Sequence, residues 1–208
     1  MIFGLDTFEL VAALITALAV WLTARQTILC WPVSLISTAM YVWVYFDARL
    51  YADSGLYVLY GGFAIYGWWL WTRGGREREV LRVSRMHRAS LLIALAVGAF
   101  SAIALSLTLS KYTDAAVPWA DSTLACFSLV AQWMTARKHL ESWIVWIVVD
   151  VFYVALFINR AMIPTAVLHG AVFLVLAVIG YLSWRRSMSA GERNESSRDE
   201  PAVESLAT

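Results

Sequence analysis

The sequence predicts an all-α membrane protein with seven transmembrane helices, in which a unit of three helices occurs twice around one connecting helix. The first observation is composition: 61% of the 208 residues are hydrophobic and only 15% are charged. A soluble domain averages about 45–50% apolar and about 25% charged residues. The mean hydropathy of +0.66 agrees. A polytopic membrane protein is therefore the first expectation.

The second observation is an internal repeat. The motif TARQTILCW at residues 23–31 returns as TARKHLESW at residues 135–143, which is 112 residues later. The same register pairs Trp31 with Trp143, Tyr41 with Tyr153, Asp47 with Asn159 and Arg73 with Arg185. Duplicated membrane units commonly build transporters, with the substrate site near mid-membrane where the units meet.

Seven stretches reach the length of about 20 mostly apolar residues that one helical crossing needs. They are residues 6–24, 29–46, 52–72, 89–109, 115–135, 140–159 and 163–184. Residues 1–186 then form one transporter domain, with repeat one at about 6–73, a linker helix at about 89–109 and repeat two at about 115–186. Residues 187–208 are rich in Ser, Glu and Arg, and we expect a disordered cytoplasmic tail.

The distribution of Lys and Arg predicts the orientation. Of the 16 basic residues, the odd-numbered loops and the C-terminus hold thirteen and the other side three. Since basic residues accumulate in cytoplasmic loops, we expect the N-terminus outside and the C-terminus in the cytoplasm of a bacterial inner membrane. Four crossings separate the copies, so the repeat is parallel and its axis lies along the membrane normal. The linker helix has no charge between 89 and 109, which suits lipid or a neighbouring subunit.

One face of the sixth predicted helix carries the strongest functional signal. Trp143, Trp146, Asp150 and Tyr153 are spaced 3, 4 and 3 residues apart and therefore share a helical face. A carboxylate at mid-span costs about 2.5–3.5 kcal/mol on insertion scales and normally faces a bundle interior or a wet cavity. This face suits a flat, cationic ring. The alternative is a structural Asp bonded to nearby hydroxyls, with the tryptophans as interfacial anchors.

The matching face of the second predicted helix carries Trp31, Ser34, Thr38 and Tyr41. The two units thus share a scaffold but differ in chemistry, which fits a substrate with a ring on one side and hydroxyl groups on the other. Gln132, near the end of the fifth predicted helix, can donate to and accept from an amide or a sugar hydroxyl. Its position near the membrane boundary also fits a role without substrate contact.

Several functions are disfavoured by what the sequence lacks. It has no phosphate-binding loop, no Gly-x-Ser-x-Gly motif and no His-Glu-x-x-His motif, so neither ATP hydrolysis nor a membrane hydrolase is expected. A retinal protein would need a lysine in its last helix, and both lysines stand at loop edges. Cys30 and Cys126 lack the spacing of a metal site. We expect no enzyme activity, no cofactor, no metal and no nucleic-acid partner.

Five stretches carry a family resemblance that covers most of residues 9–186. They are WPVSLIS, FDARLYADSGL, IYGWWLW, SLVAQWMTARKHLESWIVWIVVD and GYLSWRR. Through them the chain resembles the PnuC family of bacterial nicotinamide riboside transporters. The resemblance implies a 3+1+3 fold similar to that of SWEET sugar transporters, a homotrimer, and facilitated uptake of a form of vitamin B3 that intracellular phosphorylation makes effectively one-way.

The resemblance also implies roles for particular residues. Trp143, Trp146 and Asp150 match the substrate-binding helix of the family, and Gln132 matches a glutamine that precedes it. Asp47 and Tyr57 depart from the family pattern, which has glutamine there in many members. Related branches take thiamine, riboflavin or deoxynucleosides. We therefore expect facilitated diffusion of nicotinamide riboside, with thiamine or another nucleoside-like solute as the alternative cargo and a ligand-binding membrane receptor as the alternative class.

Overall fold

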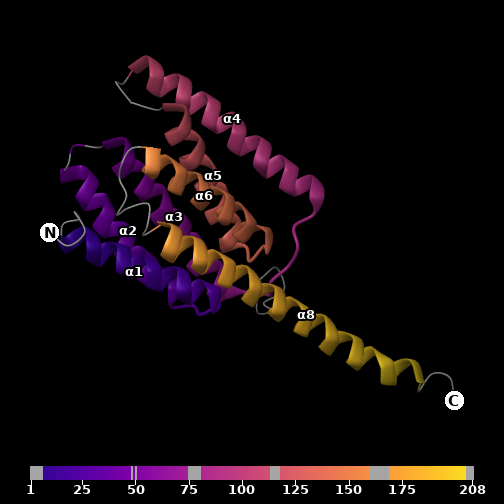
Figure 1. Cartoon of the computed structure of the whole chain (residues 1–208). Coiled ribbons are helices and arrows are strands. Elements are labelled where there is room, and N and C mark those ends of the chain that lie inside the picture. The colour runs from indigo at the N-terminus through magenta and orange to yellow at the C-terminus, as the bar shows by residue number, and fades with distance from the viewer. Residues whose placement is uncertain are drawn as a thin grey trace.

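The computed structural model describes residues 7–47, 49, 51–74, 81–112, 118–159 and 169–204, and these residues are almost entirely helical (Figure 1). The elements are α1 (Thr7–Ala24), α2 (Cys30–Asp47), α3 (Tyr51–Arg73), α4 (Arg88–Tyr112), α5 (Pro118–Ala136), α6 (Glu141–Asn159), η1 (His169–Leu174) and α8 (Val175–Glu204). The π-helical turn η1 leads directly into α8, so the described residues form seven helical rods. The predicted all-α fold of seven helices is confirmed.

The helices differ in how apolar their sequences are. Within the described residues, four helical stretches are long and apolar enough to cross a membrane: Thr7–Ala24, Arg88–Lys111, Glu141–Asn159 and Gly170–Gly191. Helices α2, α3 and α5 contain more Tyr, Ser, Thr and Asp. Large apolar side chains nevertheless point outward on these helices as on the others: Trp43 on α2, Ile65 on α3 and Phe100 on α4 are 65%, 60% and 76% exposed. An outward apolar surface with polar side chains turned toward an internal cavity is the arrangement that lipid surroundings require.

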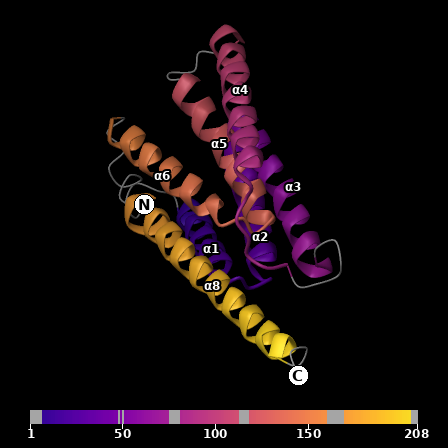
Figure 2. The same ribbon diagram turned by 90° about the vertical axis from the view of Figure 1, so that its right-hand side faces the viewer.

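Helix α4 lies outside the bundle, as its uniform apolar composition predicted. Among the described elements it packs against α5 only, and Figures 1 and 2 show it at the edge of the molecule. Leu92, Ile93, Val97 and Leu107 on this helix are all more than half exposed. The helix therefore connects the two three-helix units without entering the space between them.

The two three-helix units interlock through their third helices. Helix α3 of the first unit packs against α5 of the second, and α8 of the second packs against α1 of the first. The indole N–H of Trp71 on α3 donates to the carbonyl oxygen of Ala136 at 2.9 Å. The indole N–H of Trp184 on α8 donates to the carbonyl oxygen of Thr23 at 3.0 Å. Each unit thus fastens its third helix to the end of the other unit's first helix.

A tryptophan and a glycine mark the same packing in both units. A Cβ atom on Gly67 would lie 2.2 Å from the ring of Trp31, and one on Gly180 would lie 2.5 Å from the ring of Trp143. Only a residue without a side chain fits so close to an indole, so each glycine permits close approach of two helices. Each of these tryptophans also meets a second indole edge-on, Trp31 with Trp71 and Trp143 with Trp184.

These contacts correct one part of the predicted repeat. Gly67 and Gly180, like Trp71 and Trp184, are 113 residues apart and not 112. Arg73 therefore corresponds to Arg186 in space, and the predicted pairing of Arg73 with Arg185 was wrong by one residue. The π-helical turn at His169–Leu174 holds one more residue per turn than an α-helix and lies just before the shifted positions.

The C-terminal tail differs from expectation too. Helix α8 continues to Glu204, whereas the composition of residues 187–208 led us to expect disorder. Figure 1 shows α8 projecting well beyond the bundle. The helix is already nucleated within the bundle, so each added residue needs only propagation, although Gly191 and Pro201 are unfavourable within a helix. The predicted start of the seventh span, residues 163–168, lies outside the described residues.

Candidate functional site

A cavity of about 380 Å³ lies between the two three-helix units. Side chains from α1, α2, α3, α5, α6, η1 and α8 line it, and none comes from α4. The volume falls in the range of about 300–1,000 Å³ that is usual for small-molecule sites. All nine residues that the sequence predicted as substrate contacts line this cavity: Trp31, Ser34, Thr38, Tyr41, Gln132, Trp143, Trp146, Asp150 and Tyr153.

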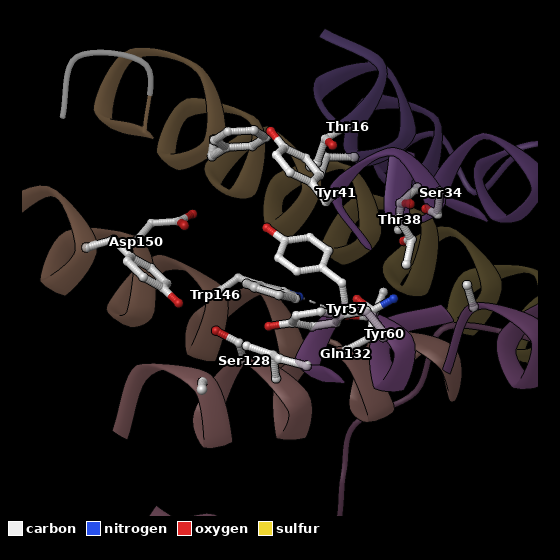
Figure 3. Close-up of a pocket in the computed structure, with 18 of the residues that line it drawn as sticks. Thr16, Ser34, Thr38, Tyr41, Tyr57, Tyr60, Ser128, Gln132, Trp146 and Asp150 are labelled. Atoms are coloured by element: carbon white, nitrogen blue, oxygen red, sulfur yellow. Dashed lines mark hydrogen bonds between the residues drawn. The ribbon is translucent and has the colours of Figure 1, made fainter. Parts of the chain in front are cut away.

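Helix α6 brings its predicted face to the cavity. Asp150 is 7% exposed, and Figure 3 shows its carboxylate directed into the space between α6 and the helices opposite. No hydrogen bond joins this carboxylate to another side chain that the structure describes, so the alternative of an Asp held by neighbouring hydroxyls finds no support there. The indole N–H of Trp146 donates to Thr135 Oγ1 at 3.2 Å, which fixes the ring beside Asp150.

The equivalent tryptophans of the two units, Trp31 and Trp143, are more deeply buried than Trp146. Trp31 is 1% and Trp143 is 2% exposed, and both indole nitrogens lack a hydrogen-bond partner among the described residues. Trp143 is thus part of the core and not an anchor at the membrane boundary. Each ring packs against a glycine. The two tryptophans form the floor of the cavity, near the end of the bundle where α1 and α5 finish. Trp146 is the more accessible indole.

Tyrosines form the wall that belongs to the first unit. The ring centroids of Tyr41 and Tyr57 lie 4.9 Å apart, those of Tyr45 and Tyr57 5.2 Å apart, and those of Tyr57 and Tyr60 5.6 Å apart. Figure 3 shows Tyr57 and Tyr60 reaching in from α3, across from Trp146. The sequence reasoning singled out Tyr41 but missed Tyr45 and Tyr60, and it noted Tyr57 only as a family departure. Repeated tyrosines within an apolar helix were the available signal.

The charged groups of the cavity are all acidic. Asp53, Asp121 and Asp150 line it, and no Lys, Arg or His is among the lining residues that the structure describes. The sequence analysis selected neither Asp53 nor Asp121 as a site residue. Asp47 lies at the exposed end of α2 and does not line the cavity. Three carboxylates inside an aromatic cavity favour a solute that carries positive charge.

Comparison with known proteins agrees with this architecture. Residues 6–186 match the family model described as nicotinamide mononucleotide transporter. The nicotinamide riboside transporter PnuC of Escherichia coli is 23% identical over 210 residues, covering 89% of this chain and 87% of that protein. The riboflavin/roseoflavin transporter RibM of Streptomyces davaonensis is 27% identical over 154 residues, covering 71% of this chain and 70% of that protein.

The fold also matches a solved structure. A crystal structure of the vitamin B3 transporter PnuC superposes with a TM-score of 0.70 at 23% sequence identity, covering 86% of this chain and 81% of that one. The relatives are transporters and not enzymes, in agreement with the sequence-based expectation. The family match covers nearly the whole helical domain, and its helices surround one central cavity. The chain therefore belongs to the nicotinamide mononucleotide transporter family, the membrane-transporter family that includes PnuC.

Proposed function

We propose that this protein moves nicotinamide riboside across the bacterial inner membrane by facilitated diffusion. The two three-helix units rock about the central cavity and expose it to one side at a time. Intracellular phosphorylation of the cargo then keeps uptake effectively one-way. The charge pattern of the loops supports an N-terminus outside and a C-terminus in the cytoplasm.

The observation that carries this proposal is the chemistry of the cavity wall. Nicotinamide riboside has a flat ring with a fixed positive charge, and the described wall offers aromatic faces and carboxylates without a basic side chain. A good cation–π contact contributes about 0.5–2 kcal/mol. A phosphate would bring about −1.5 to −2 charge toward three carboxylates, so a mononucleotide is disfavoured and the nucleoside is the better cargo.

Roles follow from position in the cavity. Trp146 stacks on the ring, Trp143 closes the floor below it, and Asp150 favours its positive charge. The polar groups of the first unit and of α5 bond the ribose and the amide, and we assign this role to Ser34, Thr38 and Gln132. The remaining predicted contacts, Trp31, Tyr41 and Tyr153, complete the aromatic enclosure.

Helix α4 supports the proposed homotrimer. Its outer face is apolar and packs on nothing else that the structure describes, so lipid or a second copy of the chain covers it in the membrane. Chemical cross-linking of the protein in native membranes, followed by sizing, measures this assembly. A species of three chains is expected, and a purely monomeric population would contradict it.

A binding panel followed by flux measurements tests the cargo. Purified protein is titrated with nicotinamide riboside, thiamine, riboflavin, uncharged nucleosides and nicotinamide mononucleotide. We expect the strongest binding from nicotinamide riboside and little from the mononucleotide. Thiamine is the alternative cargo because it also has a cationic ring, and its preference over nicotinamide riboside would reassign the substrate. Proteoliposomes then separate a transporter from a receptor, since a receptor binds the ligand without moving it.

A further inference from the structure

The chain that leads into α4 crosses the arginine-rich end of the bundle, where α1, α3 and α5 finish. Figure 1 shows it running from α4 to the point at which α8 leaves the other helices. Residues 81–87 of this chain, called the strap below, have no helical structure. We propose that the strap is the gate that closes the cavity toward the cytoplasm. The inference rests on the proposed alternating access and adds the element that must move.

Backbone hydrogen bonds hold the strap on the loop between α5 and α6. Ser84 N–H donates to the carbonyl oxygen of Lys138 at 3.1 Å, and Leu140 N–H donates to the carbonyl oxygen of Ser84 at 3.0 Å. These two bonds form a parallel bridge between Ser84 and His139. Met86 N–H donates to a carboxylate oxygen of Glu141 at 3.0 Å, which ties the strap to the first turn of α6.

The side chain of Val83 fills the seam between the two units. It is 8% exposed and belongs to one buried cluster with Ala24 of α1, Leu140, Trp143 of α6 and Trp184 of α8. The cluster therefore joins the strap to residues of the first unit, of the second unit and of the cavity floor. Val83 is thus one of the side chains that bury the floor tryptophan Trp143 at the arginine-rich end.

Lys138 adds a second layer at the same place. Its side chain is 6% exposed, its Nζ lies 4.2 Å above the ring centroid of Trp71, and it donates to Gln26 Oε1 at 3.5 Å. Gln26 is the equivalent residue of the first unit, and both have φ near +55°. The strap thus rests on a contact between matching loops of the two units, which is the contact that must open when the units rock.

The opposite end of the cavity is lined by acidic and aromatic side chains. Asp53, Tyr45 and Phe157 line the cavity there, near the outer ends of α3, α2 and α6. Ser84 and Met86 of the strap bond to the loop and to the helix start at the arginine-rich end. Releasing it would expose the cavity floor to the cytoplasm and leave the outer wall unchanged.

A reversible disulfide tests the gate directly. Ser84 Oγ and His139 Nδ1 are 3.4 Å apart, so cysteines at both positions point toward each other. The double variant Ser84→Cys with His139→Cys is made in a background with Cys30→Ser and Cys126→Ser, reconstituted and oxidised. We expect uptake of nicotinamide riboside to fall to background, binding from the outer side to remain, and uptake to return with reductant. Undiminished uptake by the fully cross-linked protein would overturn the proposal, and so would loss of binding, which would mean that the bridge distorts the site.

A second measurement needs no substrate and separates the gate from the cargo assignment. The native Cys30 is 0% exposed and lies in the neighbouring cluster at the same end of the bundle. Val83→Gly should raise severalfold the rate at which a membrane-impermeant thiol reagent modifies Cys30 from the arginine-rich side. Arg85→Gln, two residues away and exposed, is the matched control and should leave the rate unchanged. Equal rates in both variants would overturn the gate even if nicotinamide riboside is transported, whereas failure of the parent to bind any panel solute would count against the cargo alone.

Discussion

The two three-helix units are alike at the cavity floor and different in the cavity wall. At the floor, Trp31 and Trp143 each press against a glycine and meet another indole edge-on. In the wall, Thr38 stands where the second unit has Asp150. Packing was therefore retained in both units while the surface toward the solute diverged. The comparison indicates that symmetry serves the motion of the units and asymmetry serves the recognition of an asymmetric solute.

The largest expected effect comes from removing the negative charge of Asp150, which the first unit lacks at the equivalent position. Asp150→Asn keeps the size of the side chain but removes its negative charge. At an effective dielectric constant of about 20, a pair of charges about 4 Å apart contributes about 4 kcal/mol. We expect uptake of nicotinamide riboside to fall at least about tenfold, which corresponds to ~1.4 kcal/mol. Uptake is measured in proteoliposomes, with insertion checked by protein recovery.

The matched control for that variant is the equivalent position in the first unit. Thr38→Val removes one hydroxyl group at the site's other wall, and we expect a several times smaller loss of uptake. Equal losses from the two variants would mean that the two units contribute alike to the cargo. Undiminished uptake by Asp150→Asn would contradict the assigned role of the carboxylate.

The next largest effect is the loss of stability when the tryptophan–glycine packing at the cavity floor is disrupted. This loss should be similar in the two units. An alanine at Gly67 or at Gly180 puts a Cβ atom into a tryptophan ring, and such overpacking costs about 1–3 kcal/mol. Gly62→Ala is the control, because no atom lies within 4 Å of its added Cβ and alanine favours the helix. Thermal unfolding in detergent should rank the first two variants below the parent and the control at or above it. A stable Gly67→Ala variant would contradict the close approach of α3 and α2.

A smaller effect is expected from the accessible indole of the wall. Trp146→Phe removes the hydrogen bond to Thr135 and weakens the cation–π contact, together worth about 0.5–2 kcal/mol. The dissociation constant of a cationic ring should rise more than that of an uncharged nucleoside. Titration of the purified variant with both ligands measures this, and an equal rise for both would point to a packing role for Trp146.

The smallest effect should come from losing either of the two hydrogen bonds that fasten one unit to the other. Trp71→Phe and Trp184→Phe each remove one indole N–H that donates to a carbonyl oxygen of the other unit. A hydrogen bond of this kind contributes about 0.5–1.5 kcal/mol net. Trp69→Phe, at a half-exposed position of α3, is the control. A thermal stability of both variants equal to that of Trp69→Phe would contradict the fastening role of these two bonds.

Much of this protein was determined by the sequence alone. Apolar length predicted seven helices, and the 3.6-residue period placed Trp143, Trp146, Asp150 and Tyr153 on one face because side-chain direction along a helix is a local property. The repeat then indicated the equivalent face of α2. The one-residue error in pairing Arg73 arose because a fixed register takes no account of a residue added between Tyr153 and Gly180.

Only the tertiary structure decided which helices become neighbours. The spacing of Asp53, Tyr57 and Tyr60 puts them on one face of α3, but only packing against α2 and α5 shows that this face meets the cavity. The packing of each third helix against the other unit and the burial of Val83 also depend on contacts between residues far apart in the chain. In lipid, helix association depends on close van der Waals fit and on specific hydrogen bonds, not on apolar character, which every span shares. The apolar character of each span can be read from the sequence, but the van der Waals fit between helices exists only in the folded protein.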